Sequence, residues 1–305
     1  MPPRLPDIPI PPRRPLRSLA VRTIEALPDT LAISILAMQR YRHRFGRYPN
    51  ILRPRTFNEK IQVRKLFDRR QQLCLWADKF GVRDYVAAKV GPTVLAELYH
   101  VTTDPCDIPF EKLPRKYVVK PSHGSGWIQI INDGKTVNKQ ELIERCKRWL
   151  TLNYFDVTGE WVYKNIKPRI LIEEFLDSGD GNPPNDFKCF VFGGKVQAIQ
   201  VDVDRHTKHK RNLYDTKWDR IPCRFVYDNC EDVIPRPASL ETMIRYAEIL
   251  SDKVDFVRVD LYEVHGRVYF GELTNTPENG FGKFEPSSWD ATLGKFWRTG
   301  MRRTT

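Results

Sequence analysis

The sequence lacks the features of a membrane-spanning or secreted chain. No run of about 18 uninterrupted apolar residues is present, the length that a spanning helix needs. The most apolar segment, LAISILAM at 31–38, is preceded by Glu25, Pro28 and Asp29, which fits neither a spanning helix nor a secretion signal. The six cysteines form no C-x-x-C pair, and a chain of 305 residues does not need disulfides to fold. We therefore expect a soluble cytoplasmic protein with reduced thiols.

Several catalytic and cofactor motifs are also missing. No G-x-G-x-x-G follows a strand pattern, which argues against a doubly wound dinucleotide-binding sheet. No G-x-S-x-G and no Ser-His-Asp spacing are found, and no cysteine lies in an activating context. The sequence therefore offers no evident signature of a protein nucleophile.

Acidic residues are scarce in the first 70 residues. This segment holds sixteen lysines and arginines against five acids, a balance of +11, whereas the whole chain carries +12. Such asymmetry indicates either an acidic partner, namely a polyanionic polymer, anionic lipid or nucleic acid, or simply a solvated basic face. No nucleic-acid-binding motif accompanies the charge, so we do not expect a nucleic acid.

Three regions can be distinguished along the chain. Seven of the first fifteen residues are proline, so this stretch reads as an extended arm. Residues 17–44 read as a helix that either docks on the body or lies on a membrane surface. We expect an arm and helix at 1–54, helices with a first lobe at 55–176, and a second lobe at 177–305. A helix near 83–90 is expected to end at Gly91.

The strand signals predict an α+β fold with largely antiparallel sheets. Two β-branched and aromatic runs are interrupted by Gly193-Gly194 and by His265-Gly266, which predicts two hairpins. Asp260 and Glu272 lie on the two arms of the second hairpin, so strand pairing can bring both carboxylates together. Such a pair suits Mg²⁺, which takes one or two carboxylates and keeps positions for phosphate oxygens. The alternative is a pair of solvent-facing acids.

Six fragments in order resemble one family of nucleotide-using enzymes. They are FNEKIQ, ADKFGVRDYV, VVKPSHGSG, DFKCFVFGGK, VRVDLY and FGELTNTPENGF, within residues 55–298. This series resembles the ATP-grasp superfamily and, more narrowly, its TupA-like branch, named after a teichuronopeptide biosynthesis protein and found among cell-envelope polysaccharide enzymes. The resemblance implies two α+β lobes that hold ATP between them.

The resemblance also implies roles for individual residues. Lys120 resembles the lysine that reaches the ATP phosphates, Lys79 an earlier phosphate-binding lysine or else a surface charge, and Arg258 the arginine that stabilises the developing oxyanion. Arg205 is a candidate for the phosphate or acyl phosphate, with a plain loop arginine as the alternative. His123 could contact phosphate or assist the amine, or have a structural role. The remaining residues implied for ATP are the phosphate-covering loop Ser122, His123, Gly124, Ser125 and Gly126, the adenine hinge Glu173, Glu174, Phe175 and Leu176, and Asp186 with Lys188 near the ribose.

The sequence departs from the family pattern in two places. Many relatives read Glu-x-Asn, whereas here Glu272 is followed by Leu273, Thr274 and then Asn275, so either Thr274 or Asn275 completes the metal shell with Asp260 and Glu272. In addition, no clear nucleotide-fold lobe precedes residue 70.

The resemblance implies an ATP- and Mg²⁺-dependent carboxylate–amine ligase that forms an amide through an acyl phosphate. Its place among polysaccharide enzymes suggests an acidic saccharide as the carboxylate and an amino acid or simple amine as the acceptor. The basic N-terminal segment suggests contact with the inner face of the membrane. Two alternatives stay open, a kinase-like phosphotransferase and a non-catalytic polyanion-binding module.

Overall fold

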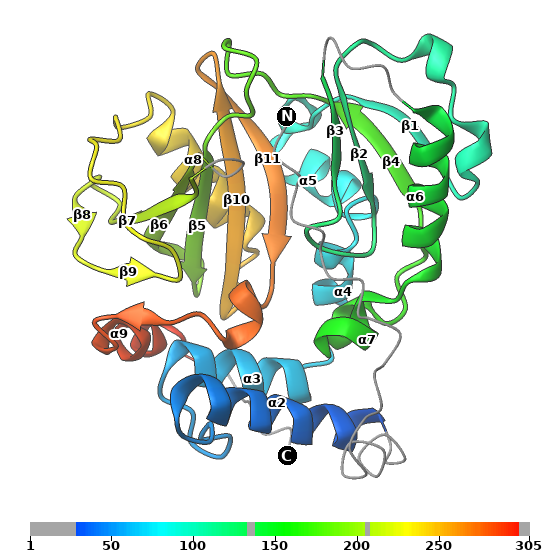
Figure 1. Ribbon diagram of the computed structural model, residues 1–305. Coiled ribbons are helices and arrows are strands. Elements are labelled where there is room, and N and C mark those ends of the chain that lie inside the picture. Colours follow the sequence, from blue (N-terminus) through cyan, green and yellow to red (C-terminus); the bar gives the residue numbers. More distant parts are fainter. Residues whose placement is uncertain (1–28, 133–137, 205–207, 299–305) are drawn as a thin grey trace.

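The computed structural model describes residues 29–132, 138–204 and 208–298. Two antiparallel sheets stand side by side above a layer of helices (Figure 1). This arrangement confirms the predicted α+β class. Among the described residues, no helix is both long and apolar enough to cross a bilayer.

The first sheet has four strands in the order β1-β4-β2-β3. Helix α6 packs on it, joined by a small core around Val119, Leu142 and Ile172. The elements of this part are β1 (Leu98–Thr102), β2 (Tyr117–Pro121), β3 (Gln129–Ile131), α6 (Lys139–Thr151), α7 (Tyr154–Thr158) and β4 (Ile170–Glu174).

The second sheet has six strands in the order β11-β10-β5-β6-β7-β8. Its two long hairpins turn at Gly193-Gly194 and at His265-Gly266, where all four residues have positive φ, as two-residue hairpin turns require. Both predicted hairpins are therefore confirmed. The elements are β5 (Asp186–Phe192), β6 (Lys195–Val203), β7 (Lys210–Tyr214), β8 (Arg220–Ile221), β9 (Arg224–Phe225), α8 (Leu240–Leu250), β10 (Phe256–Val264), β11 (Arg267–Thr274), the 3₁₀ turn η5 (Pro277–Gly280), β12 (Phe284–Glu285) and α9 (Ser288–Phe296).

Two of the N-terminal helices contribute to the core of the second sheet. Helices α4 (Gln71–Ala77) and α5 (Val82–Val90) place Trp76 and Val86 in the same core as Val191 and Leu250. The split of the chain into lobes at residue 176 stays a prediction, but α4 and α5, which we assigned to the first lobe, pack against β11 and α8. Helix α5 ends at Gly91, as predicted.

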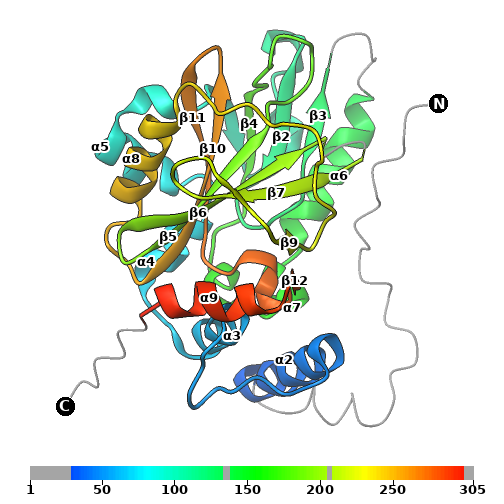
Figure 2. The same cartoon turned by 90° about the vertical axis from the view of Figure 1, so that its left-hand side faces the viewer.

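Two further helices form the floor beneath the sheets (Figure 2). Helix α3 (Phe57–Phe67) begins at Thr56 with a capping box that includes Glu59, and it packs on α9. Helix α2 (Asp29–Phe45) lies below α3. The helix predicted for 17–44 is thus present from residue 29, while the proline-rich arm falls outside the described residues. Helix α3 and α9 also close an aromatic core around Phe57, Phe190 and Trp297.

Candidate functional site

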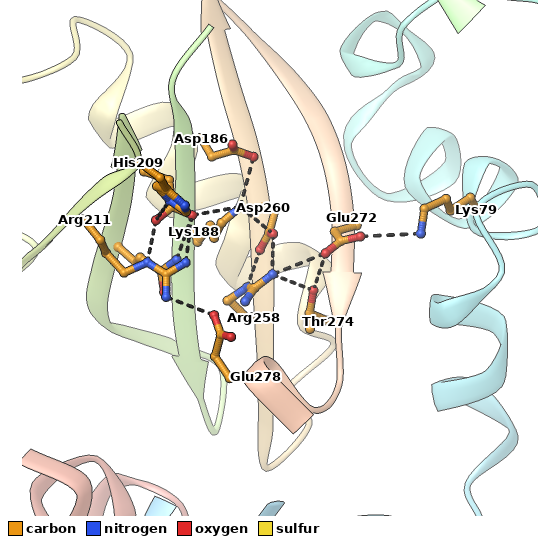
Figure 3. A network of polar contacts seen from close by, with 12 residues as sticks. Lys79, Asp186, Lys188, His209, Arg211, Arg258, Asp260, Glu272, Thr274 and Glu278 are labelled. Carbon is orange, nitrogen blue, oxygen red and sulfur yellow. Dashed lines mark hydrogen bonds and ion pairs between the residues drawn. The ribbon is translucent and has the colours of Figure 1, made fainter. Parts of the chain in front are cut away.

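The β10–β11 hairpin brings four polar side chains to one face of the second sheet. Asp260 pairs with Glu272 in the ladder, and Arg258 pairs with Thr274. Residues two apart on a strand point to the same side, so these four groups converge (Figure 3). The structure therefore brings together the carboxylates and the arginine that the sequence singled out.

Arg258 is locked onto Asp260 by two hydrogen bonds. Its Nε donates to Asp260 Oδ1 at 2.7 Å and its Nη2 to Asp260 Oδ2 at 2.6 Å, and both side chains are buried. Burial acts to lower the pKa of Arg258, but Asp260 beside it raises that pKa above its usual value. Such a bidentate pair fixes the guanidinium in position and keeps it cationic.

Glu272 is the more accessible of the two carboxylates. Its Oε1 accepts from Thr274 Oγ1 at 2.8 Å and from Arg258 Nη2 at 3.3 Å, and its Oε2 lies 3.5 Å from Lys79 Nζ. Burial acts to raise the pKa of Glu272, but the cations Lys79, Arg258 and Lys188 together hold it well below its usual range. Glu272 is therefore an ionised acceptor that joins the second sheet to the connection between α4 and α5.

Thr274, not Asn275, lies beside these groups. Thr274 Oγ1 accepts from Arg258 Nη2 at 3.0 Å, whereas the Asn275 side chain is buried on the other side of the chain and donates to the Leu73 carbonyl at 2.8 Å. The reason is the alternation of side chains along a strand, which points neighbouring residues to opposite faces. Of the two candidates for the metal shell, the structure places only Thr274 next to Glu272.

Lys188 and Asp186 extend the site along β5. Lys188 pairs with Asp260 in the ladder, and its Nζ lies 3.0 Å from Asp186 Oδ1, 3.2 Å from Asp260 Oδ2 and 3.6 Å from Asp202 Oδ2. All four side chains are buried. Buried charges are tolerated when each has opposite charges and hydrogen bonds around it. Lys188 thus holds three carboxylates together.

The charged face continues onto residues that the sequence reading missed. Arg211 on β7 bonds Asp202 at 2.5 Å through Nε, and its Nη1 donates to Glu278 in η5 at 2.9 Å. A sequence signal for them exists, because Gln200 and Asp202 alternate with the buried Ile199 and Val201 in β6. Asp186 and Lys188 alternate with apolar residues in β5 in the same way. Polar residues with period two at one end of an apolar strand indicate a buried polar face.

The predicted adenine and phosphate residues of the first sheet form an ion pair. Lys120 Nζ lies 2.5 Å from Glu173 Oε2, and Arg83 Nη1 donates to Glu173 Oε1 at 2.9 Å. The Glu173 carboxylate, predicted to accept from adenine, therefore already has two cationic donors. Arg83 was not singled out from the sequence, although it lies in one of the quoted fragments.

The loop after β2 is held in place by hydrogen bonds with residues outside the loop. Lys79 Nζ donates to the Gly124 carbonyl at 2.8 Å, and Ser122 Oγ, which is buried, donates to the Lys167 carbonyl at 3.2 Å. A Cβ at Gly124 would lie 2.7 Å from the Trp127 ring, so glycine is required there. Ser125 is half-buried and Gly126 is exposed with φ of 75°.

His123 makes the contacts expected of a structural residue, and its contact with phosphate or the amine stays a prediction. Its ring is buried, and Nε2 lies 3.1 Å and 3.2 Å from the carbonyls of Trp149 and Leu152 at the end of α6. Burial lowers the pKa of His123, which keeps the ring neutral. The ring thus lies against the end of α6, where backbone carbonyls lack partners within the helix and need donors.

The other predicted residues lie at and after the end of the central strand β4 or outside the described part. Glu174 closes β4 and accepts from the Glu97 amide at 3.1 Å, Phe175 is buried, and Leu176 is half-buried. Arg205 falls in the segment 205–207, outside the described residues.

The donor set at the hairpin suits a hard dication. Two carboxylates and one hydroxyl supply oxygen ligands of the kind that Mg²⁺ prefers. No group of three His, Cys, Asp or Glu side chains that could hold a metal occurs in the described part of the chain. Since Asp260 is held by Arg258 and Lys188, Glu272 and Thr274 offer the more available oxygens.

Comparisons with known proteins were made for sequence and for structure. The sequence model of the family described as TupA-like ATPgrasp matches residues 59–298. No curated protein matches the sequence.

Similar solved structures include three ligases. A D-alanine–D-alanine ligase from Bacillus anthracis complexed with ATP is 19% identical over 66% of this chain and 54% of its own, with a TM-score of 0.39. A phosphoribosylamine–glycine ligase from Thermotoga maritima is 15% identical over 72% of this chain and 55% of its own, with a TM-score of 0.42. The ATP-grasp ligase PsnB complexed with its minimal precursor, Mg and ADP is 11% identical over 74% of this chain and 60% of its own, with a TM-score of 0.39. The chain thus spans little more than half the length of these structures.

Proposed function

The chain belongs to the TupA-like ATP-grasp family, and from this premise we propose that it is an ATP-dependent ligase that joins a carboxylate to an amine. The observation that carries the proposal is the convergence of Lys79, Arg258, Glu272 and Thr274 between the two sheets. Cations and oxygen ligands at one point are what phosphoryl chemistry requires.

Nucleotide binding would use the facing edges of the two sheets. Lys79 and Lys120 would bind phosphate oxygens, and each already has a carboxylate partner that the phosphates would replace. The loop 122–126 would cover the phosphates with its backbone amides, and the segment at Glu174–Leu176 would take the adenine. Asp186 lies at the start of β5 near this edge and would face the ribose.

Glu272 and Thr274, with Asp260 behind them, would hold Mg²⁺. The metal, when bound, would neutralise charge on the phosphate groups. Arg258 would stabilise the negative charge that develops on the carboxylate oxygen as the acyl phosphate forms and breaks, because its guanidinium is fixed by Asp260. Preorganised charge of this kind lowers the barrier without reorganisation during the reaction.

The proposed reaction has two steps. A substrate carboxylate oxygen attacks the γ-phosphorus of ATP, and the bond to the β,γ-bridging oxygen breaks, so that ADP leaves. The amine nitrogen then attacks the carbonyl carbon of the acyl phosphate, the C–O bond to phosphate breaks, and the nitrogen loses a proton. The products are an amide, ADP and inorganic phosphate.

The substrates we propose are an acidic saccharide and an amino acid or simple amine, in cell-envelope or exopolysaccharide biosynthesis. The proposal rests on the family branch and on the basic character of the first 70 residues.

We also propose contact with the anionic inner face of a membrane. Residues 30–58 contain six arginines and no acid, and all six arginines are exposed. Leu52 is 91% exposed and Tyr48 54% exposed beside them, a mixture that suits a lipid interface. Co-sedimentation with vesicles tests this: binding to anionic vesicles that falls with salt supports it, and no binding contradicts it.

The experiment that tests the ligase is release of ADP from Mg-ATP by the purified protein. Uronic-acid saccharides and amines are added singly and in pairs, with Lys120→Ala and Glu272→Ala as inactive controls and Lys147→Ala on exposed α6 as an active control. Release that requires both a carboxylate and an amine supports the ligase. Release with a hydroxyl acceptor alone would indicate a phosphotransferase, and nucleotide binding without turnover would indicate a binding module.

A further inference from the structure

A largely apolar cavity with cationic side chains at its border lies outside the network at the hairpin. It has a volume of about 160 Å³ and is bordered by α2, α3 and the segment from α7 to the 3₁₀ turn η4 (Trp161–Tyr163). These elements meet below the first sheet (Figure 1). The lining side chains are Ile33, Lys65, Leu66, Phe155, Trp161 and Lys164, together with Arg69, Gly159 and Asn165.

The charge of this lining is one-sided. Three of its residues are cations, and none is an acid. The Arg69 guanidinium lies over the Trp161 ring, 5.0 Å from its centroid, and donates to backbone carbonyls at the end of α3, the shortest contact being 2.7 Å to Leu66. It makes no ion pair with a carboxylate in the described residues. Apart from Asn165 and Gly159, the remaining walls are aromatic and aliphatic, so the cavity combines an apolar body with a cationic edge.

Lys65 is the unusual member of the lining because it is buried and has no carboxylate partner among the residues that the structure describes. Its residue is 3% exposed, and no carboxylate oxygen of the described chain lies within 4.0 Å of its Nζ. The ammonium instead makes two long contacts, to Gln62 Oε1 and to the Asn279 carbonyl, each at 3.4 Å, and lies 5.0 Å from the centre of the Phe281 ring. Its pKa falls to about 8, chiefly through burial.

The acid that acts on Lys65 from further away is Glu160, which is engaged elsewhere. Its carboxyl accepts a hydrogen bond from the Thr276 hydroxyl, and burial raises its pKa. Arg40 of α2 faces Lys65 from the other side and adds positive charge. A buried ammonium in this setting lacks the counter-charge that buried cations normally have.

We propose that this cavity binds a small organic acid, with its anionic group against Lys65 and Arg69 and its ring or apolar body against Trp161 and Phe155. The volume of the cavity limits the size of the apolar part of the ligand, because a cavity of about 150 Å³ holds a benzene ring. The anion would supply the charge that Lys65 lacks, and charge-assisted hydrogen bonds are the strong ones.

Binding at this cavity is coupled by contact to the hairpin site. Lys65 and Gln62 both contact the carbonyl of Asn279 in η5, the turn that follows Thr274 along the chain. An acid bound against Lys65 would therefore lie beside η5, which directly follows the strand that carries the proposed metal ligands Glu272 and Thr274. The inference does not depend on turnover of ATP, because it concerns binding alone.

Isothermal titration of the full-length protein without nucleotide tests the inference. Benzoate is compared with benzyl alcohol, and glucuronate with glucose, so that each acid has an uncharged counterpart of similar size. The same titrations are made with Lys65→Met, with Arg69→Met, which changes an exposed side chain, and with the control Lys147→Met on α6. Mg-ATP binding and thermal unfolding of each variant confirm that it is folded.

The expected result is saturable binding of at least one acid, with its uncharged counterpart at least about tenfold weaker. Lys65→Met and Arg69→Met should each weaken that acid about tenfold or more, while Lys147→Met leaves it unchanged. No binding of either acid at millimolar concentration, equal binding of acid and uncharged counterpart, or unchanged affinity in Lys65→Met would each overturn the inference. A variant that loses acid binding but still binds Mg-ATP, or one that does the reverse, distinguishes a failure of this proposal from a failure of the proposed ligase.

Discussion

Replacing Lys65 by methionine should stabilise the protein at neutral pH, although it removes a charged side chain from a helix. The unfolded ammonium has an ordinary pKa of 10.5, and burial lowers the pKa of Lys65 to about 8 in the fold. Because one pKa unit corresponds to about 1.4 kcal/mol, the charged form costs the folded state about 3 kcal/mol. Methionine cannot make the two polar contacts at 3.4 Å, and their loss offsets about 1 kcal/mol of the gain. We therefore expect Lys65→Met to raise the free energy of unfolding by about 2 kcal/mol at pH 7, since methionine keeps the unbranched stem.

The gap in free energy of unfolding between Lys65→Met and the wild type should shrink as the pH rises. Between pH 8 and pH 10.5 the unfolded chain binds more protons at Lys65 than the folded chain does, so the stability of the wild type rises with pH relative to the variant. The advantage of Lys65→Met is complete below pH 8 and should shrink by about 2 kcal/mol by about pH 9.5. Other groups that titrate in this range are common to both proteins and cancel in the difference.

Urea unfolding of both proteins across this pH range measures the gap. Lys147→Met is the matched control. Lys147 is exposed, and its ion pair with Glu144 raises its pKa. Lys147 therefore stays protonated in both the folded and the unfolded chain up to about pH 9.5, and the gap for this variant should not change. A gap for Lys65→Met that stays constant or widens as the pH rises would refute the account of Lys65 as a destabilised ammonium. A variant less stable than the wild type at pH 7 would do the same.

Three further predictions concern the site and the floor of helices. Lys120→Met should weaken Mg-ATP binding by about tenfold or more, because one charge-assisted phosphate contact is lost; unchanged affinity by titration calorimetry would remove Lys120 from the nucleotide site. Thr274→Val should raise the Mg²⁺ concentration needed for half-maximal ATP turnover while Thr274→Ser restores it, since only the hydroxyl contacts Glu272 and Arg258; equal Mg²⁺ dependence in all three proteins would exclude Thr274. Gly294→Ala should lower the free energy of unfolding by about 1 to 3 kcal/mol, because a Cβ there would lie 2.1 Å from the Arg55 carbonyl oxygen, and thermal unfolding of the variant at the wild-type temperature would contradict this packing.

The hairpins and the pairing of carboxylates could be predicted because their signals are local. Gly193-Gly194 and His265-Gly266 allow the positive φ angles of tight turns, and a turn between two strands fixes which residues face each other. Asp260 and Glu272 therefore came together as expected. Side chains alternate between the two faces of a strand, so Thr274, two residues after Glu272, lies on the same face as Glu272 and Asn275 does not. This rule favours Thr274 over Asn275 from the sequence alone.

Other features depend on contacts between distant segments, which the sequence does not encode locally. The His123 ring lies against carbonyls of Trp149 and Leu152, and its burial follows from how α6 packs on the first sheet. Lys65 lies in a helical pattern of buried residues, but only the packing of α2 and η4 around α3 shows that its ammonium has no carboxylate partner in the described part of the chain. Long-range packing decides both cases.

The most direct test of the proposed ligase is the origin of the oxygen in the released phosphate. The carboxylate substrate that supports turnover with an amine is labelled with ¹⁸O, and the inorganic phosphate from Mg-ATP is analysed by mass spectrometry. An acyl phosphate requires that one carboxylate oxygen leave with the phosphate, so the account predicts one ¹⁸O atom in each phosphate formed. Phosphate without the label, during turnover that yields the amide, would contradict the acyl-phosphate mechanism.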